Sequence, residues 1–315
     1  MRSEFFKHMK SSVTHVSVLL QEVINGLDVQ ARETVLDATL GGGGHAQLLL
    51  QRVGASGTVI AIDADNAALI RSREHLEHTA KHYGATLFLE QSNFRYIHEV
   101  LKKIGITEVH KVLFDLGLSS QEIEESGRGF SFKRNEPLLM TFSNELRADE
   151  LTAQEIVNTW DEENIAIIIK SYGEERYARR IARAIIEVRQ HKTIETTFDL
   201  VEIIINATPH SYHHMKIHPA TRTFQALRMT VNDEVGALKD GLLHAFEALV
   251  PDGRIAVISF HSIEDRIVKH FFKQLIVDGK AGQITKKPII PTVEEIEENP
   301  RSRSAKLRII SKTVQ

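Results

Sequence analysis

The stretch Thr34-Val-Leu-Asp-Ala-Thr-Leu-Gly-Gly-Gly-Gly-His45 predicts the architecture of the chain. An apolar, β-branched run ends in a carboxylate, Asp37, and then opens into four consecutive glycines, Gly41 to Gly44. The following segment, 45–52, combines good helix formers with an apolar stripe. Strand, glycine turn and helix follow one another in nucleotide-binding βα units. Glycine lets the backbone pass close to a ligand there, and the helix N-terminus points its N–H groups at it.

A second strand, expected at 58–63, also ends in an acid. Asp63 lies 22 residues after Gly41, close to the roughly 20-residue spacing at which such folds place a carboxylate against ribose hydroxyls. A glycine cluster alone is also compatible with a tight turn. The two strands and the spaced acid together favour a cofactor of the nucleoside type, and they leave open which one.

Composition limits the class of protein. The 315 residues suffice for one large domain or two modest ones, and 42% hydrophobic and 26% charged residues are ordinary for a globular protein. No run approaches the roughly 20 apolar residues that span a bilayer, and residues 1–10 lack the apolar core of a signal peptide, so a cytoplasmic enzyme is expected. The absence of cysteine excludes disulfides, thiolate zinc sites and a cysteine nucleophile. With a net charge of −3, nucleic-acid contacts depend on local basic patches.

Strands alternate with helices along most of the chain. Further strands are expected at 86–90, 111–115, 254–261 and 306–310, and helices at 16–27 and about 66–78. This order predicts an α/β fold with a parallel, doubly wound, Rossmann-like sheet that binds ligands at the carboxyl ends of its strands. Asp37, Asp63 and Asp115 each end a strand, so all three acids are expected at that edge.

Far more residues than one crossover needs lie between Gly117 and Arg254. Helices are expected there at 152–160, 162–172, 174–190 and 198–207. We therefore predict a discontinuous core, residues 1–125 and 217–315, interrupted by a helical insertion domain at 126–216. The core is expected to resume in one long helix near 223–249.

Two motifs at strand ends carry candidate chemistry. Phe94 follows the third strand, where a ring can stack on an adenine base, although a turn with one core phenylalanine fits equally well. Asp115 opens the segment Asp115-Leu-Gly-Leu-Ser-Ser120. Its carboxylate can accept a hydrogen bond from an exocyclic amine and orient the nitrogen for in-line attack on a methyl group. The alternative for Asp115 is an acid that caps a loop.

The segment 259–266 starts a helix, with Ser262 expected as the N-cap and Asp265 at the third helical position of a capping box. Three roles remain open for His261: a hydrogen-bond donor that positions the substrate, a base, or a side chain that only fills space. A metal site from His261, Glu264 and Asp265 is not expected, because their spacing does not place three ligands on one helix face.

Basic residues form one helical stripe within 172–192. It is either a solvated face or a phosphate-binding surface shared with basic residues near the C-terminus. The residues concerned are Arg176, Arg179, Arg180, Arg183, Arg301, Arg303, Lys306 and Arg308. A histidine cluster, His213, His214 and His218, is expected in a surface loop rather than at a metal.

Eight motifs, in order along the chain, resemble those of the bacterial small-subunit ribosomal RNA cytosine-N4 methyltransferases, the RsmH or MraW family. They are Gly42-Gly-Gly-His45, Asp115-Leu-Gly-Leu-Ser-Ser120, Arg128-Gly-Phe-Ser-Phe132, Tyr172-Gly-Glu-Glu-Arg176, His218-Pro-Ala-Thr-Arg-Thr-Phe-Gln-Ala-Leu-Arg228, Val231-Asn-Asp-Glu234, Ile258-Ser-Phe-His-Ser-Ile-Glu-Asp-Arg266 and Asn299-Pro-Arg-Ser-Arg-Ser-Ala-Lys-Leu-Arg308. The resemblance covers nearly the whole chain, from about His15 to Arg308.

The resemblance implies a class I methyltransferase fold. It also implies an enzyme that uses S-adenosylmethionine to methylate the exocyclic N4 amine of a cytidine in the decoding region of 16S ribosomal RNA, with the small ribosomal subunit as its partner. Asp115 would orient the amine without a covalent intermediate. The residues that would contact the cofactor are Gly43, Gly44, His45, Asp63 at the ribose, Phe94 at the adenine, Asp115 beside the methionine moiety, and Glu122.

Two departures from the family pattern stand out. Gln121-Glu122 replaces Pro-Gln, which puts a charged glutamate at the usual glutamine contact, and Leu139 and Thr141 replace an acid and an arginine. If those charges hold RNA or a lid, turnover or substrate choice differs here. The alternatives are therefore a paralogue that binds ribosomal RNA without catalysis and, from pattern alone, a nicotinamide-dependent dehydrogenase. Against the dehydrogenase, the bulky neighbourhood of Leu48 replaces the third glycine of G-x-G-x-x-G.

Overall fold

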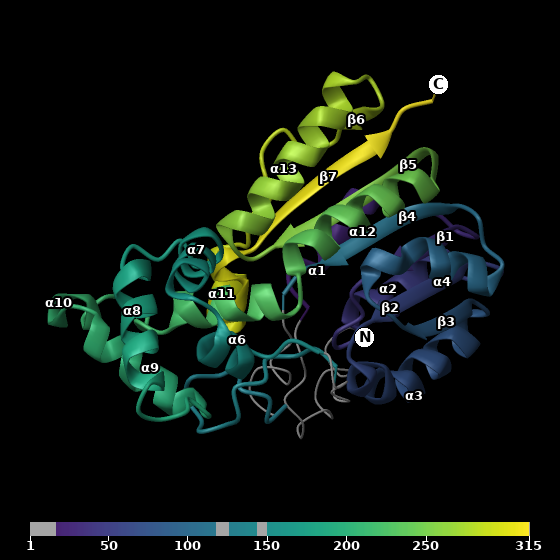
Figure 1. Cartoon of the computed structure of the whole chain (residues 1–315). Helices are drawn as coiled ribbons and strands as arrows, with labels where there is room; N and C mark the ends of the chain where they lie inside the picture. The colour runs from purple at the N-terminus through teal and green to yellow at the C-terminus, as the bar shows by residue number, and fades with distance from the viewer. Residues whose placement is uncertain (1–16, 118–125, 144–149, 315) are drawn as a thin grey trace.

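The computed structural model describes residues 17–117, 126–143 and 150–314. A helix-covered sheet forms one lobe and a group of helices forms a second lobe beside it (Figure 1). Among the helices that the structure describes, none combines the length and the apolar character that a bilayer crossing requires.

The sheet has seven strands in the order β3-β2-β1-β4-β5-β7-β6. Their bounds are β1 Thr34–Asp37, β2 Thr58–Asp63, β3 Thr86–Gln91, β4 Val109–Asp115, β5 Leu249–Ser259, β6 Ala281–Gln283 and β7 Lys306–Lys312. Strands β1 to β5 are parallel, which confirms the doubly wound, Rossmann-like prediction. The sequence predicts no direction for the C-terminal strand, and β7 runs antiparallel between β5 and β6.

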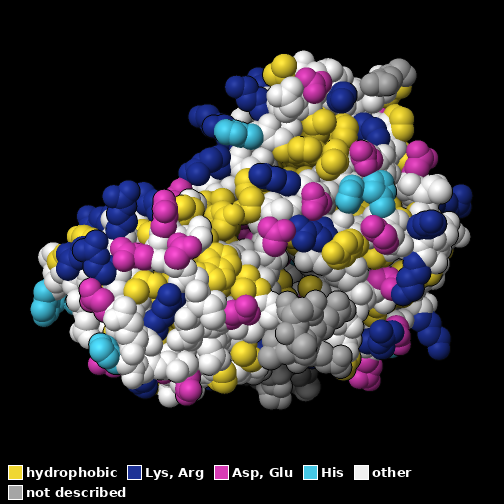
Figure 2. All heavy atoms as spheres, in the orientation of Figure 1, with side chains coloured by type: hydrophobic (Ala, Val, Ile, Leu, Met, Phe, Trp, Pro, Cys, Tyr) yellow, Lys and Arg dark blue, Asp and Glu magenta, His cyan; other side chains and the backbone are white. Residues whose placement is uncertain are grey.

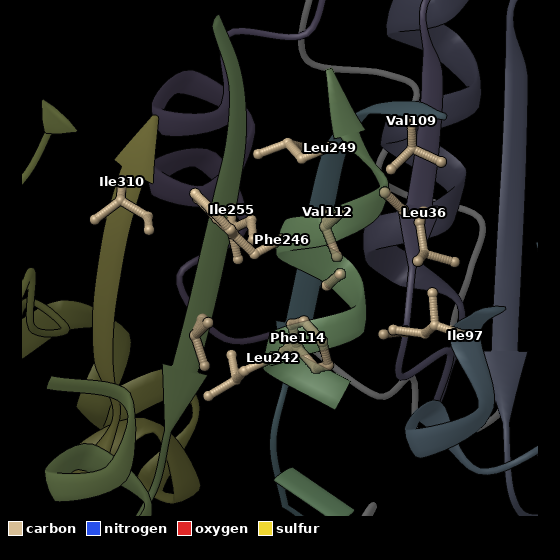
Figure 3. Close-up of a cluster of buried hydrophobic side chains, with 14 of the residues drawn as sticks. Leu36, Ile97, Val109, Val112, Phe114, Leu242, Phe246, Leu249, Ile255 and Ile310 are labelled. Carbon is tan, nitrogen blue, oxygen red and sulfur yellow. The ribbon is translucent and has the colours of Figure 1, made fainter. Parts of the chain in front are cut away.

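Helices cover both faces of the sheet because successive strand residues point to opposite sides. The α-helices of the first lobe are α1 Leu20–Leu27, α2 Gly44–Val53, α3 Asn66–Tyr83, α4 Ile97–Ile104, α12 Glu234–Ala248, α13 Ser262–Val277 and α14 Val293–Glu298. The same lobe has two 3₁₀ helices, η1 Phe94–Tyr96 and η2 Pro300–Ser304. One apolar cluster joins α4, α12 and α13 to the sheet, and another joins α1, α2 and α3 to its other face. Figure 3 shows Leu242 and Phe246 of α12 pointing toward Phe114 and Ile255 of the strands.

The second lobe has its own apolar cluster. Its helices are α6 Ala153–Thr159, α7 Glu162–Gly173, α8 Ala178–Arg189, α9 Thr197–Ala207, α10 His210–His213 and α11 Thr221–Val231. Phe224 and Leu227 of α11 are buried in this cluster. The boundary after residue 216 stays a prediction, and we propose to move it to Val231 because α11 packs with the insertion.

The long helix expected near 223–249 is wrong as a single element. It is divided into α11 and α12 at Asn232 and Asp233, and Asp233 has a left-handed backbone (φ 44°) and caps α12 by accepting from the Gly236 N–H. Short polar side chains compete with helical hydrogen bonds in this way. Asn232 also donates to the Met140 carbonyl (2.7 Å) and accepts from the Phe142 N–H (2.9 Å), so the break ties the two lobes together.

Candidate active site

The three strand-end acids lie at one edge of the sheet, as predicted. Asp37 ends β1, Asp63 ends the neighbouring β2, and Asp115 ends β4 on the other side of β1. Asp37 is fully buried, whereas the other two acids are half-buried. The edge therefore presents two half-buried carboxylates, Asp63 and Asp115, beside the fully buried Asp37.

The glycine loop is held by Asp63. Its carboxylate accepts from the Gly41 N–H and from the Asp65 N–H, both at 2.8 Å. Gly43 has a left-handed backbone (φ 78°) and precedes α2, whose N-terminus has no side-chain cap. A Cβ on Gly44 would overlap the Ser17 hydroxyl. The loop thus leaves the first N–H groups of α2 without a capping side chain, as a ligand-binding helix N-terminus requires.

Asp115 is poised to exchange a proton near neutral pH. Its N–H donates to the Thr39 hydroxyl (2.6 Å), and its side chain is 17% exposed. Oδ1 has no hydrogen-bond partner among the described residues, while Oδ2 lies 3.5 Å from Nδ1 of His45. Burial, and then the charge of Glu264, raise the pKa of Asp115 to about 7. A carboxyl group with such a pKa is suited to accept hydrogen from an amine.

A cavity of about 80 Å³ lies next to Asp115, at the junction of the two lobes. Its wall includes Phe94, Leu116 and Gly117 from the first lobe and Phe142, Arg228 and Glu234 from the segments that join the lobes. Phe94 also meets Phe114 edge to face, with ring centroids 5.6 Å apart. The Phe94 ring thus lies partly in the core and partly at the cavity, and its contact with adenine stays a prediction.

Comparison with known proteins gives the family. The model of the MraW methylase family matches residues 12–313. The chain belongs to this family. A curated "Ribosomal RNA small subunit methyltransferase H" from Brevibacillus brevis is 43% identical and aligns over 96% of this chain and 98% of its own, and one from Paenibacillus sp. is 41% identical over 95% and 99%. The dehydrogenase alternative is therefore set aside.

Solved structures give weaker similarity. A protein titled as an rRNA methylase from Streptococcus thermophilus covers 96% of this chain and 100% of its own, with 10% identity and a TM-score of 0.44. A putative rRNA-methylase from Clostridium thermocellum covers 94% and 98%, with 14% identity and a TM-score of 0.43. The fold assignment rests instead on the strand order and directions of the sheet.

This MraW methylase uses S-adenosylmethionine as its cofactor, and its strand-end residues fit that group. The uncapped α2 N-terminus, the left-handed Gly43 and the carboxylate of Asp63 form a cradle of backbone N–H groups and an acid. Asp115, whose Oδ1 has no hydrogen-bond partner in the part of the chain that the structure describes, ends β4 at the same edge. Which of these atoms contact the cofactor stays a prediction. The expected contact of Glu122 lies outside the described residues.

Replacing Gly43 with alanine is expected to weaken S-adenosylmethionine binding about 10-fold, because a left-handed alanine costs roughly 1–2 kcal/mol and the loop relaxes out of the conformation that would present its N–H groups to the cofactor. The new Cβ would also lie 3.1 Å from the Ser72 and His75 side chains. Titration calorimetry measures the change. Gly105→Ala is the matched control, because Gly105 has the same backbone (φ 75°) with nothing within 4 Å of an added Cβ. Equal affinity losses in both variants would contradict a role for the loop.

Asp37 differs from the other two acids. Burial raises its pKa well above the ordinary value, the Thr39 N–H opposes this, and the charges of Asp115 and Asp63 raise it further. The charged form of Asp37 is therefore disfavoured beside the other two acids.

The far wall of the cavity carries a charge network that the sequence did not reveal. Arg228 holds Glu234 through two hydrogen bonds, of 2.7 and 2.9 Å. Buried Glu264 accepts from the Phe260 N–H (2.8 Å) and lies 3.1 Å from Nε2 of His261. Burial raises the pKa of Glu264, but His261 and the Phe260 N–H outweigh it and hold the pKa below its usual value. Glu264 therefore places a negative charge in the cavity wall near Asp115.

The expected cap of α13 is wrong by one residue. His261, not Ser262, is the N-cap, because its backbone is extended and its Nδ1 accepts from the Glu264 N–H in a capping box. Glu234, His261 and Glu264 each bring one ligand atom to within 4.8 Å of the others. Asp265 instead pairs with Lys306 (3.1 Å) and Arg308 (2.7 Å). Arg228 and His261 already pair with the two glutamates, so we assign no metal to this group.

Leu139 and Thr141 lie in the segment that precedes Phe142 in the cavity wall. Thr141 is buried and donates to the Ser143 carbonyl (3.0 Å), and Leu139 is half-buried. An arginine at position 141 would have to leave this buried position or find an acid. The two departures therefore alter the segment that leads to Phe142 and leave the strand-end acids unchanged.

Proposed function

We propose that this methylase transfers the methyl group of S-adenosylmethionine to the exocyclic N4 amine of a cytidine in the decoding region of small-subunit ribosomal RNA. The observation that carries the proposal is the half-buried Asp115, whose Oδ1 has no hydrogen-bond partner among the described residues and whose two following residues, Leu116 and Gly117, line the cavity. The names of the two curated relatives support this substrate. Such a substrate places the reaction in the cytoplasm.

The amine nitrogen of cytosine is a poor nucleophile because its lone pair is delocalised into the ring. S-adenosylmethionine, when bound, supplies a methyl group on an electron-poor sulfur. Asp115 accepts one amine hydrogen and turns the nitrogen lone pair toward that methyl group, so that proximity and orientation supply much of the acceleration. The cytidine leaves its base stack to reach the cavity.

The basic face of the insertion is the proposed RNA-binding surface. Lys and Arg side chains gather on the helical lobe, on the side where α8 and α10 lie (Figures 1 and 2). Arg176 lies 4.9 Å from the centroids of the Tyr177 and Tyr212 rings, which hold its guanidinium in place. Exposed Arg179 and Arg180 line a groove of about 570 Å³ between α8 and α9. Lys306 and Arg308, expected to contribute, are occupied by Asp265.

Reversing the charge of Arg179 and Arg180 to glutamate is expected to raise KM for the RNA substrate at least 10-fold. Each lost phosphate contact weakens binding and lowers the salt dependence of binding by nearly one unit of its logarithmic slope. The value of kcat and the affinity for S-adenosylmethionine should stay unchanged. The same charge change at Arg73 and Lys81 of α3, in the other lobe, serves as the control. A KM that rises equally in both pairs would mean that only overall charge matters.

The deciding experiment is transfer of labelled methyl groups to small ribosomal subunits that lack the modification, followed by nucleoside analysis. N4-methylcytidine at a single site is the expected product. We also propose that the assembled subunit is the preferred partner, so naked RNA should accept methyl groups more slowly. No transfer by an enzyme that still binds S-adenosylmethionine would favour the non-catalytic RNA-binding paralogue, for which Leu139 and Thr141 are the sequence argument.

A further inference from the structure

A short segment in front of α1 lies against the start of α2. The carbonyl oxygen of Val18 is 3.2 Å from Nε2 of His45, which is the second residue of α2. The N–H of Leu19 donates to Oε1 of Glu295 in α14 (2.7 Å). Residues 17–19 are therefore held between two helices that are far apart in the sequence.

The backbone of this segment is strained. Leu19 has a left-handed conformation (φ 51°) and is 1% exposed. A bulky side chain disfavours that conformation, which glycine adopts readily. Strain of this kind persists only where surrounding contacts enforce it, and it is frequent at ligand clamps. The course of residues 17–19 thus follows from their contacts with α2 and α14, and it suggests a binding role for the segment.

The first residue of the segment, Ser17, brings a hydroxyl group to the start of α2. Ser17 is 8% exposed, and its hydroxyl has no hydrogen-bond partner among the described residues. A Cβ on Gly44 would overlap Oγ of Ser17 and lie 3.3 Å from its Cβ. Any larger residue at position 44 would therefore push the hydroxyl away. Because buried hydroxyl groups usually have a partner, we expect a ligand that binds at this place to supply one.

The N-terminus of α2 favours a negatively charged partner. The N–H of Gln47 donates to the Gly43 carbonyl (2.9 Å) and closes the first turn, so the N–H groups before it are not used by the helix itself. These groups and the positive end of the helix dipole attract an anion and repel a cation. The methionine moiety of S-adenosylmethionine carries a carboxylate and an ammonium group. The helix end therefore suits the carboxylate, whereas the strand-end acids attract the ammonium group.

We propose that Ser17 binds the cofactor: its hydroxyl donates a hydrogen bond to the carboxylate of S-adenosylmethionine at the N-terminus of α2. The first N–H groups of α2 bind the same carboxylate. Gly44 makes room for the hydroxyl, and the contacts of Val18 and Leu19 hold the segment in place. The proposal deepens the cofactor site and does not depend on which RNA base receives the methyl group.

Titration calorimetry with S-adenosylmethionine and with decarboxylated S-adenosylmethionine tests the proposal. The second ligand keeps the ammonium and sulfonium groups and lacks only the carboxylate. Ser17→Ala is expected to weaken binding of S-adenosylmethionine about 10-fold or more, because a hydrogen bond to a charged group contributes roughly that factor. Its affinity for the decarboxylated ligand should change less than about 2-fold. Equal changes for the two ligands, including no change for either, would overturn the proposal.

Ser72→Ala is the matched control. Ser72 is 2% exposed and borders the same loop, because its Oγ would lie 3.1 Å from a Cβ on Gly43. Its hydroxyl already donates to the Gly41 carbonyl (3.5 Å). Any loss of affinity in this variant should therefore be the same for both ligands. A loss at Ser72 that is confined to the carboxylate-bearing ligand, as large as that at Ser17, would also contradict the assignment.

A second variant, Gly44→Ala, moves the Ser17 hydroxyl without removing it. The added Cβ should displace the hydroxyl and cause the same selective loss of S-adenosylmethionine affinity. Adding Ser17→Ala to this variant should then cause no further loss, because the two changes remove one interaction. Losses that add up in the double variant would contradict the proposal. These measurements need neither RNA nor turnover, so they decide the role of Ser17 even if the wild type methylates no ribosomal subunit.

Discussion

Asp115→Asn is expected to lower kcat by about 100- to 1,000-fold, the usual range for removing a group that both orients and accepts a proton. The amide keeps the shape and one acceptor oxygen, but it cannot take up a proton. Affinity for S-adenosylmethionine should change no more than a few-fold, because asparagine keeps the shape and one acceptor oxygen beside the methionine moiety, and Asp63 still holds the glycine loop. The loss should therefore fall on kcat and leave binding nearly intact.

The same substitution is expected to stabilise the fold above neutral pH. The pKa of Asp115 rises from 3.8 to about 7 on folding, so the native state binds more protons than the unfolded chain between these values. Stability therefore falls as pH rises through this window, by up to about 4 kcal/mol. This is an upper bound, because the side chain is 17% exposed and keeps some hydration. Asparagine removes this penalty, and a higher urea midpoint at pH 8 than at pH 4, relative to the wild type, is the expected result.

Single-turnover methyl transfer and urea unfolding measure the two effects of Asp115→Asn. Asp63→Asn provides the contrast, since it should weaken S-adenosylmethionine binding while leaving kcat at saturation within a few-fold. If Asp115→Asn kept more than a third of wild-type kcat, the carboxylate would have neither role.

Gly173→Ala is expected to destabilise the insertion by about 3 kcal/mol, the upper part of the range for overpacking. Helix propensity alone predicts the opposite, a gain of up to about 1 kcal/mol. The structure reverses the sign, because a Cβ on Gly173 would overlap the Arg222 carbonyl oxygen and lie 3.0 Å from its carbon. Both atoms are backbone of α11, so relief requires α7 and α11 to separate.

Urea unfolding followed by the fluorescence of Trp160, the one tryptophan of the chain, reports on this lobe. Ser171→Ala is the matched control, because Ser171 is exposed on the same helix two residues earlier. The control should be neutral or slightly stabilising. A Gly173 variant as stable as the control would show that the two helices can repack at no cost.

The carboxyl edge of the sheet was predictable because a physical rule connects local signals to it. Asp37, Asp63 and Asp115 each end an apolar strand, and parallel strands end together. The direction of β7 had no such signal, since an apolar run reads the same in either direction. The break at Asn232 and Asp233 was likewise hidden, because it depends on hydrogen bonds to Met140 and Phe142, which are distant in sequence.

The chemistry between side chains was less predictable than their placement. The sequence pointed to His45 as part of the glycine loop, but no local pattern indicates that its ring turns toward Asp115, 70 residues away. The pairing of Arg228 with Glu234 depends on the helix break, which brings the two side chains together at the cavity. The sequence suggested testing Asp265 with His261 and Glu264 as metal ligands because the three are neighbours along the chain. In the structure Asp265 instead forms ion pairs with Lys306 and Arg308 of β7.

The interruption of the sheet has a consequence for how the chain folds. Strands β4 and β5 are hydrogen-bonded neighbours, yet residues 116–248 lie between them. If that segment stayed unfolded, pairing the two strands would require closing a very long loop, and contacts of such sequence separation form slowly. A folded insertion replaces most of this loop with a rigid body, whose α11 leads directly into α12. The folded insertion thus helps β4 and β5 to find each other. A substitution that destabilises only its helices, such as Gly173→Ala, should therefore also slow the pairing of these two strands in the distant sheet.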